Sequence, residues 1–68
     1  MKQIEKRLES IVSTRPQFAT SCAAFLSFLK AAHEDAAKIP GYIPEAGEQF
    51  LENWAGQQLD ELLAAIGD

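Results

Sequence analysis

The sequence predicts an all-α protein, and three observations support this prediction. Apolar residues recur at spacings of three and four over three long segments. No stretch of five residues alternates apolar and polar side chains with the β-branched enrichment of a strand. Two proline-containing breaks, "TRPQ" at 14–17 and "KIPGYIPE" at 38–45, separate the segments. At 68 residues we expect one small domain, in which a short amphipathic helix precedes a long antiparallel helical hairpin.

The first helix is predicted at about 2–13, where apolar residues form one stripe and the remaining positions are charged or polar. A helix this short is marginal in isolation, so its stripe must pack against the rest of the protein. Thr14 is a candidate N-cap for the next helix, with Gln17 as its capping-box partner and Pro16 in the first turn. The stripe consists of Ile4, Leu8, Ile11 and Val12.

The second helix, at about 16–38, is the most apolar part of the chain. It has a heptad seam that runs from Phe18 to Ile39, and further apolar residues lie on two other faces. A helix that is apolar around most of its circumference needs neighbours on several sides, which a chain of this size can hardly supply. We therefore expect a homodimer that forms a helical bundle around the second helices. The predicted homo-oligomer interface is Phe18, Cys22, Phe25, Leu29, Ala32 and Ala36.

The third helix is predicted at about 44–66. Pro44 suits the first turn of a helix, and Gly67 suits the position just after its end. Gly56 lies inside the helix, where it favours a close helix crossing or a bend. The apolar positions of this helix are Phe50, Leu51, Trp54, Ala55, Leu59, Leu62, Leu63 and Ile66.

The connector at 38–45 is unusually apolar for a loop. Pro40 and Gly41 fit the centre of a tight turn. Ile39 continues the heptad seam, so we expect Ile39, Tyr42 and Ile43 to fold over the end of the bundle as a lid on the core. If these three residues are exposed together, the loop is instead a candidate partner-binding site.

The net charge of −4 is unevenly distributed. Residues 1–15 carry +2, whereas residues 44–68 carry −6 and no basic residue. This asymmetry predicts that the first segment docks near the third, in the same chain or in a partner chain, although both could be ordinary solvated faces. The acidic total argues against nonspecific nucleic-acid binding.

No catalytic, cofactor-binding or metal-binding residue is predicted. Cys22 and His33 are eleven residues apart, which is about 16 Å along a helix, so the two cannot form a catalytic pair within it. His33, Glu34 and Asp35 resemble a fragment of a metal site, but neither a zinc-protease nor a di-metal pattern is complete around them. The paired carboxylates Glu48 and Glu52 fall on the polar face of their helix.

The function expected from these features is a non-enzymatic protein–protein interaction module. It would be a small acidic homo-oligomeric adaptor or accessory inhibitor, of the kind that phages and mobile elements encode, that binds and occludes a larger protein. The chain contains no signal-peptide pattern, and its most apolar run, at 18–29, is too short to cross a bilayer, so we expect a cytoplasmic protein without membrane partners. Candidate partner-binding residues are Tyr42, Ile43, Glu48, Glu52 and Trp54.

Two alternative functions remain open from the sequence. The first is a small-ligand-binding bundle with an apolar pocket between its helices, lined by Phe25, Phe28, Leu29 and Trp54. The second is a DNA-binding regulator that uses the basic cluster of the first helix, namely Lys2, Lys6, Arg7 and Arg15.

Overall fold

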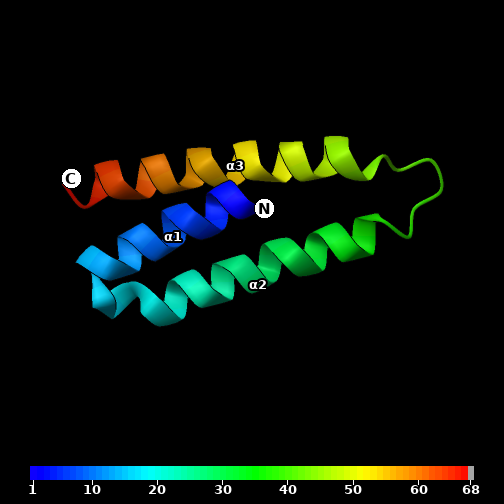
Figure 1. Cartoon of the computed structure of the whole chain (residues 1–68). Helices are drawn as coiled ribbons and strands as arrows, with labels where there is room; N and C mark the ends of the chain where they lie inside the picture. The colour runs from blue at the N-terminus through cyan, green and yellow to red at the C-terminus, as the bar shows by residue number, and fades with distance from the viewer. Residues whose placement is uncertain (68) are drawn as a thin grey trace.

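Three α-helices and one short 3₁₀ helix make up the protein, as the computed structural model of residues 1–67 shows (Figure 1). Helix α1 spans Lys2–Thr14, the 3₁₀ helix η1 spans Pro16–Phe18, α2 spans Ala19–Ala36 and α3 spans Pro44–Ala65. No strand occurs between residues 1 and 67. The prediction of an all-helical protein with three helices is confirmed.

The break between α1 and α2 differs from the sequence prediction. Arg15 has an extended conformation (φ −136°, ψ 75°), which is the conformation that a following proline favours. Pro16 then begins η1, and α2 starts only at Ala19. The predicted capping box is wrong, because Thr14 ends α1 and its hydroxyl donates to the carbonyl oxygens of Ser10 and Ile11 instead.

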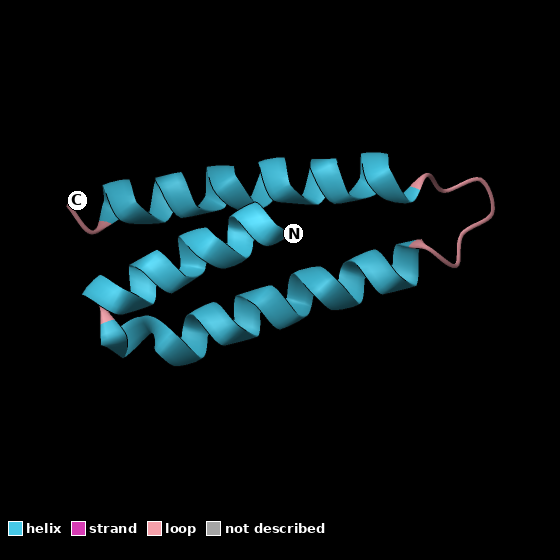
Figure 2. Ribbon diagram, in the orientation of Figure 1, coloured by secondary structure: helices cyan, strands magenta, loops and turns pink. Residues whose placement is uncertain are grey.

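Helix α1 packs against one side of the two long helices, which contact each other and run in opposite directions (Figure 1). It contacts both of them, and its N-terminus lies beside the first half of α3. The link between α1 and η1 is short, whereas a longer loop joins α2 to α3 at the far end of the molecule (Figure 2). The result is an elongated body with principal extents of 41 × 19 × 16 Å.

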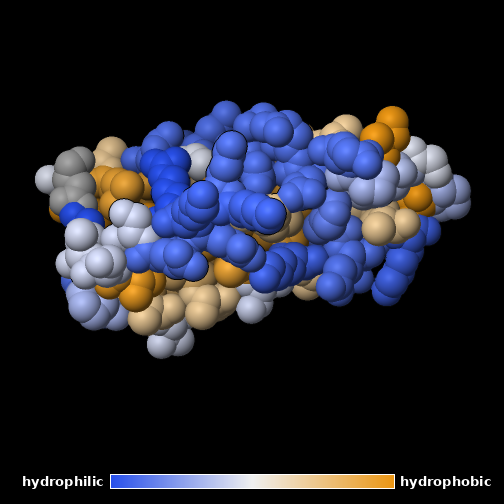
Figure 3. Space-filling view, in the orientation of Figure 1, coloured by the Kyte–Doolittle hydropathy of each residue, from blue (hydrophilic) through white to orange (hydrophobic). Residues whose placement is uncertain are grey.

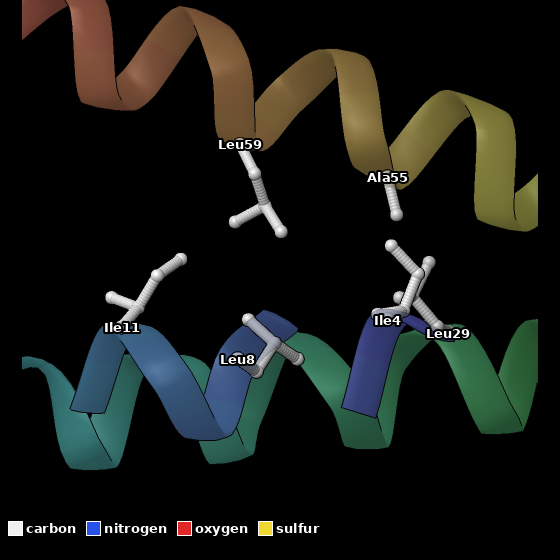
Figure 4. Close-up of a cluster of buried hydrophobic side chains, with 6 residues drawn as sticks. All are labelled: Ile4, Leu8, Ile11, Leu29, Ala55 and Leu59. Carbon is white, nitrogen blue, oxygen red and sulfur yellow. The ribbon is translucent and has the colours of Figure 1, made fainter. Parts of the chain in front are cut away.

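Helix α1 supplies half of the buried core, although it is the shortest of the three α-helices. The predicted stripe accounts for this, because its side chains point between α2 and α3 (Figure 4). Val12, the fourth residue of that stripe, is only half-buried. Within the single chain, α2 contributes one buried residue, Leu29. The central position of the second helices in a dimer stays a prediction. The core consists of Ile4, Leu8, Ile11, Leu29, Ala55 and Leu59.

Both predicted glycine turns are present. The amide N–H of Tyr42 donates to the carbonyl oxygen of Ile39 at 3.1 Å, which closes a turn around Pro40 and Gly41. Gly41 has a φ of +83°, as the third position of a type II turn requires. Gly67 has a φ of +84° and follows the last turn of α3, so it ends that helix as predicted.

Candidate interaction surface

Four aromatic side chains form one surface across α2 and α3, which we call the aromatic face: Phe25, Phe28, Phe50 and Trp54. The Trp54 ring lies 6.0 Å from the Phe25 ring and 6.4 Å from the Phe28 ring, both in tilted arrangements. Phe50 precedes Trp54 by one helical turn. Phe28 is 59% exposed, Phe50 69% and Trp54 37%, so these rings face solvent.

The aromatic face lies on the side of the α2–α3 pair that α1 does not cover. Lys30 of α2 pairs with Glu5 of α1, and Phe28 stands two residues before Lys30. Glu52 of α3 pairs with the N-terminal amine, and Phe50 and Trp54 stand two residues to either side of it. Two residues correspond to about 200° of helix rotation, so the aromatic side chains point away from α1.

The opposite side, over α1, is polar. Hydrophilic residues cover most of the middle of the molecule in Figure 3, where α1 and α3 lie, and hydrophobic residues gather mainly toward the two ends. The two sides of this small protein therefore differ in chemical character.

Ion pairs join the N-terminal segment to α3, as the charge distribution predicts for docking within the chain. The guanidinium of Arg7 pairs with the carboxylate of Asp60 and donates to the carbonyl oxygen of Gly56 at 3.3 Å. The N-terminal amine of Met1 pairs with Glu48 and, at 3.3 Å, with Glu52.

These pairs shift the acidity of several groups. The hydrogen bond from the N-terminal amine holds the pKa of Glu48 below its ordinary value, and the same bond raises the pKa of the amine. On the other side of α1, Lys30 lies 3.0 Å from Glu5 and lowers the pKa of that carboxyl through its hydrogen bond.

The apolar loop does not form a lid over the core. Ile39 is 60% exposed and Ile43 is 62% exposed, so the prediction that both face the core is wrong. Helix α2 ends at Ala36, and the turn that follows carries Ile39 away from the heptad direction. Ile39 and Ile43 therefore match the alternative prediction from the sequence, in which the apolar loop is exposed.

Tyr42 differs from its neighbours in the loop because it folds back on the helices. Its hydroxyl lies 3.1 Å from Nδ1 of His33, and the two rings meet edge to face with centroids 5.9 Å apart. The phenol also lies across Gly47, where a Cβ atom would overlap it. Gly47 therefore makes room for Tyr42, a role that helix periodicity cannot reveal.

The predicted homo-oligomer interface faces the interior of the chain for much of its length. Leu29 is fully buried, and Phe18, Cys22 and Phe25 pack against the core. Ala32 and Ala36 are half-buried. No second copy is present in the structure, so the role of these six residues between copies stays a prediction.

The predicted partner-binding residues are divided between two environments. Ile43 and Trp54 offer exposed apolar surface. Glu48 and Glu52 hold the N-terminal amine, and Tyr42 contacts His33. Phe28 and Phe50 were missing from the predicted partner-binding set, although their positions two residues from Lys30 and Glu52 could have indicated a shared outer side.

An apolar pocket of about 290 Å³ opens between the helices near η1. Of the four residues predicted to line a ligand pocket, only Phe25 lines this one. Cys22 is also in its wall, and burial raises the pKa of the Cys22 thiol. The lining residues are Leu8, Ile11, Phe18, Ser21, Cys22, Phe25, Gln58, Leu59 and Leu62.

Residues 1–67 contain no group of three or more His, Cys, Asp or Glu side chains placed to hold a metal ion. Over the same residues, no helix combines the length and the apolar character that crossing a membrane requires. Comparison of the chain with protein-family models, with curated proteins and with solved structures finds no match.

Proposed function

We propose that the chain is a non-enzymatic protein–protein interaction module that dimerises through its aromatic face and, as a dimer, binds and occludes a larger protein. The observation that supports this proposal is the exposure of Phe28, Phe50 and Trp54 on the side that α1 leaves uncovered. Phenylalanine and tryptophan are enriched in protein interfaces, and tryptophan is among the residues most enriched at their energetic centres.

The area of the aromatic face suits a small interface. At about 200 Å² for each fully exposed aromatic side chain, the exposed parts of Phe28, Phe50 and Trp54 amount to roughly 300 Å². A standard interface covers about 800 Å² on each partner, with an apolar centre and a polar rim. The aromatic face would provide that centre, and the polar residues around it would provide the rim.

A second copy of the chain is the occupant that fits this face best. The four aromatic residues carry no charge, so two copies can meet there without electrostatic repulsion. A two-fold dimer needs a self-complementary patch, and a row of rings that can interleave is one. Residues 1–67 bury only six hydrophobic side chains, so association would compensate for a small core.

On α2, the proposed interface is centred on Phe28, whereas the predicted heptad seam is centred on the next residue, Leu29. Leu29, the central seam residue, is fully buried in the chain, whereas Phe28 is exposed. This shift corresponds to a rotation of about 100° around the helix. Phe25 belongs to both sets of residues, and it is the position at which the earlier prediction and the present proposal overlap.

The larger partner would meet the surface that a dimer leaves open at the loop end. Ile39 and Ile43 provide apolar contacts there, and α3, which begins beside them, carries acidic side chains and no basic one. A partner with an apolar patch in basic surroundings fits this combination. Such a module would act as an adaptor or as an accessory inhibitor, by covering a surface of its partner.

Analytical ultracentrifugation over a micromolar concentration range tests the dimer directly. We expect the wild type to dimerise and Phe28→Ala to remain monomeric. The substitution removes about 100 Å² of apolar contact from each copy, which weakens the dimer more than a thousandfold. Ile39→Ala is the matched control, because Ile39 is 60% exposed and Phe28 is 59% exposed.

Two results would contradict the proposal. One is a wild-type chain that stays monomeric throughout the range, and the other is an equal effect of the two substitutions. Circular dichroism of each variant checks that the helical fold is retained.

A further inference from the structure

The pocket near η1 is lined by all three α-helices and by η1, and it is open to solvent on one side. Its floor is the apolar stripe of α1, represented by Leu8 and Ile11, and its walls come from η1, α2 and α3. Ser21 and Gln58 are its two polar residues. Ser21 precedes Phe28 by seven residues and Gln58 follows Trp54 by four, so both lie on the side of the aromatic face.

The lining of the pocket selects the chemistry of an occupant. None of its nine lining residues is charged, whereas three further pockets among the described residues each contain at least two charged side chains. An ion that entered this pocket would lose its hydration without gaining a counter-charge. The Ser21 hydroxyl and the Gln58 amide can each donate and accept one hydrogen bond to a neutral polar group.

The volume sets the size of the occupant. A dry apolar cavity of about 150 Å³ accommodates benzene. A pocket of about 290 Å³ therefore accommodates a molecule of roughly ten to twelve non-hydrogen atoms.

We propose that this pocket binds a small uncharged molecule, apolar over most of its surface, with one hydroxyl or N–H group directed at Ser21 and Gln58. The proposal does not depend on dimerisation, because every lining residue belongs to one chain. The pocket is distinct from the one expected from the sequence, since Phe28, Leu29 and Trp54 do not line it.

Binding of 1-naphthol, an uncharged bicyclic compound with one hydroxyl, tests the proposal by calorimetry. We expect saturable binding with one molecule per chain, and binding of the anion 1-naphthoate at least tenfold weaker. Bound 1-naphthol should also slow alkylation of the Cys22 thiol by iodoacetamide several-fold, because Cys22 lines the pocket.

Two leucine substitutions on α2 provide the matched comparison. Ser21→Leu places a larger side chain in the pocket, whereas Ala24→Leu lies on the same helix at an exposed position that lines none of the four pockets. We expect Ser21→Leu to weaken binding of 1-naphthol at least tenfold and Ala24→Leu to leave it unchanged. Cys22→Leu fills the same pocket from its wall and should act like Ser21→Leu.

Three outcomes would overturn the proposal. The first is no saturable binding by a chain that circular dichroism shows to be folded. The second is equal binding by the Ser21→Leu and Ala24→Leu variants. The third is binding that weakens tenfold as the chain concentration rises through the dimerisation range, because the occupant would then be a side chain of a second copy.

Discussion

Gly47 offers the sharpest test of the packing at the loop end of the molecule. Replacing glycine by alanine within a helix normally stabilises a protein by about 0.5–1 kcal/mol, because it reduces the backbone freedom of the unfolded chain. At Gly47 the added Cβ would overlap the phenol of Tyr42. We therefore expect Gly47→Ala to displace Tyr42 and to destabilise the protein.

The magnitude follows from the contacts that Tyr42 would lose. Its hydroxyl lies 3.1 Å from Nδ1 of His33, and such a hydrogen bond contributes about 1 kcal/mol. The edge-to-face contact of the two rings, at 5.9 Å, adds about 0.5–1.5 kcal/mol. After subtraction of the helix-propensity gain, Gly47→Ala should lower the free energy of unfolding by about 0.5–2 kcal/mol.

Urea unfolding of four chains measures this effect. The chains are the wild type, Gly47→Ala, Tyr42→Ala and the double variant, which together form a double-mutant cycle. In the Tyr42→Ala background the phenol that overlaps the added Cβ is absent, so Gly47→Ala should stabilise the protein by about 0.5–1 kcal/mol. The gain in helix propensity cancels in the cycle, so the coupling energy between the two sites should be about 1.5–2.5 kcal/mol.

Gly56→Ala is the control within the same helix. A Cβ at Gly56 would lie 3.6 Å from Nη1 of Arg7, which is an ordinary van der Waals contact. We expect this substitution to stabilise the protein, with a rise in melting temperature of several degrees. Equal stabilisation by Gly47→Ala and Gly56→Ala, with no coupling to Tyr42, would refute the placement of Tyr42 over Gly47.

Two further predictions concern the core and the charged surface. Leu29→Ala should lower the free energy of unfolding by about 2–5 kcal/mol, because Leu29 is fully buried. Phe28→Ala at the neighbouring position should lower the free energy of unfolding of the monomer far less. Urea unfolding at a chain concentration below the dimerisation range compares the two variants. A comparable loss in both would contradict the inward orientation of Leu29. Glu5 has a lowered pKa because of its hydrogen bond to Lys30, so its contribution to stability is present above its ordinary pKa of 4.5 and is lost as the pH falls through the folded-state pKa. The urea midpoint of the wild type should therefore exceed that of Glu5→Gln at neutral pH, and this difference should vanish in acid. The control is Glu9→Gln, which removes an exposed carboxylate of the same helix. A difference that persists unchanged in acid would contradict the proposed role of the Glu5–Lys30 pair.

Most of the local structure could be predicted from the sequence. The spacing of Ile4, Leu8 and Ile11 defined the buried side of α1, because polar residues fill the other positions and leave one choice of face. Pro40 and Gly41 defined the turn between α2 and α3, because glycine readily adopts the positive φ that this turn needs. The opposite net charges of residues 1–15 and 44–68 predicted that these segments would lie close together, and Arg7 pairs with Asp60.

The orientation of α2 could not be predicted in the same way. Apolar residues lie on three of its faces, so the periodicity permits several choices for the buried side. The heptad seam predicted Leu29 as an interface residue between copies, and it could not show that α1 of the same chain would cover that residue. The exposure of Phe28 follows from that arrangement, because one short helix can cover only one side of the α2–α3 pair.

By itself, the sequence determined three helices, their breaks and the attraction between their charged ends, since these depend on proline, glycine and the spacing of side chains along the chain. Only the tertiary structure decided that α1 packs against one side of the α2–α3 pair, that Ile39 and Ile43 face solvent and that Tyr42 rests on Gly47. The physical reason is that burial depends on which elements meet in space. With apolar residues on most faces of α2, local periodicity leaves that choice to packing.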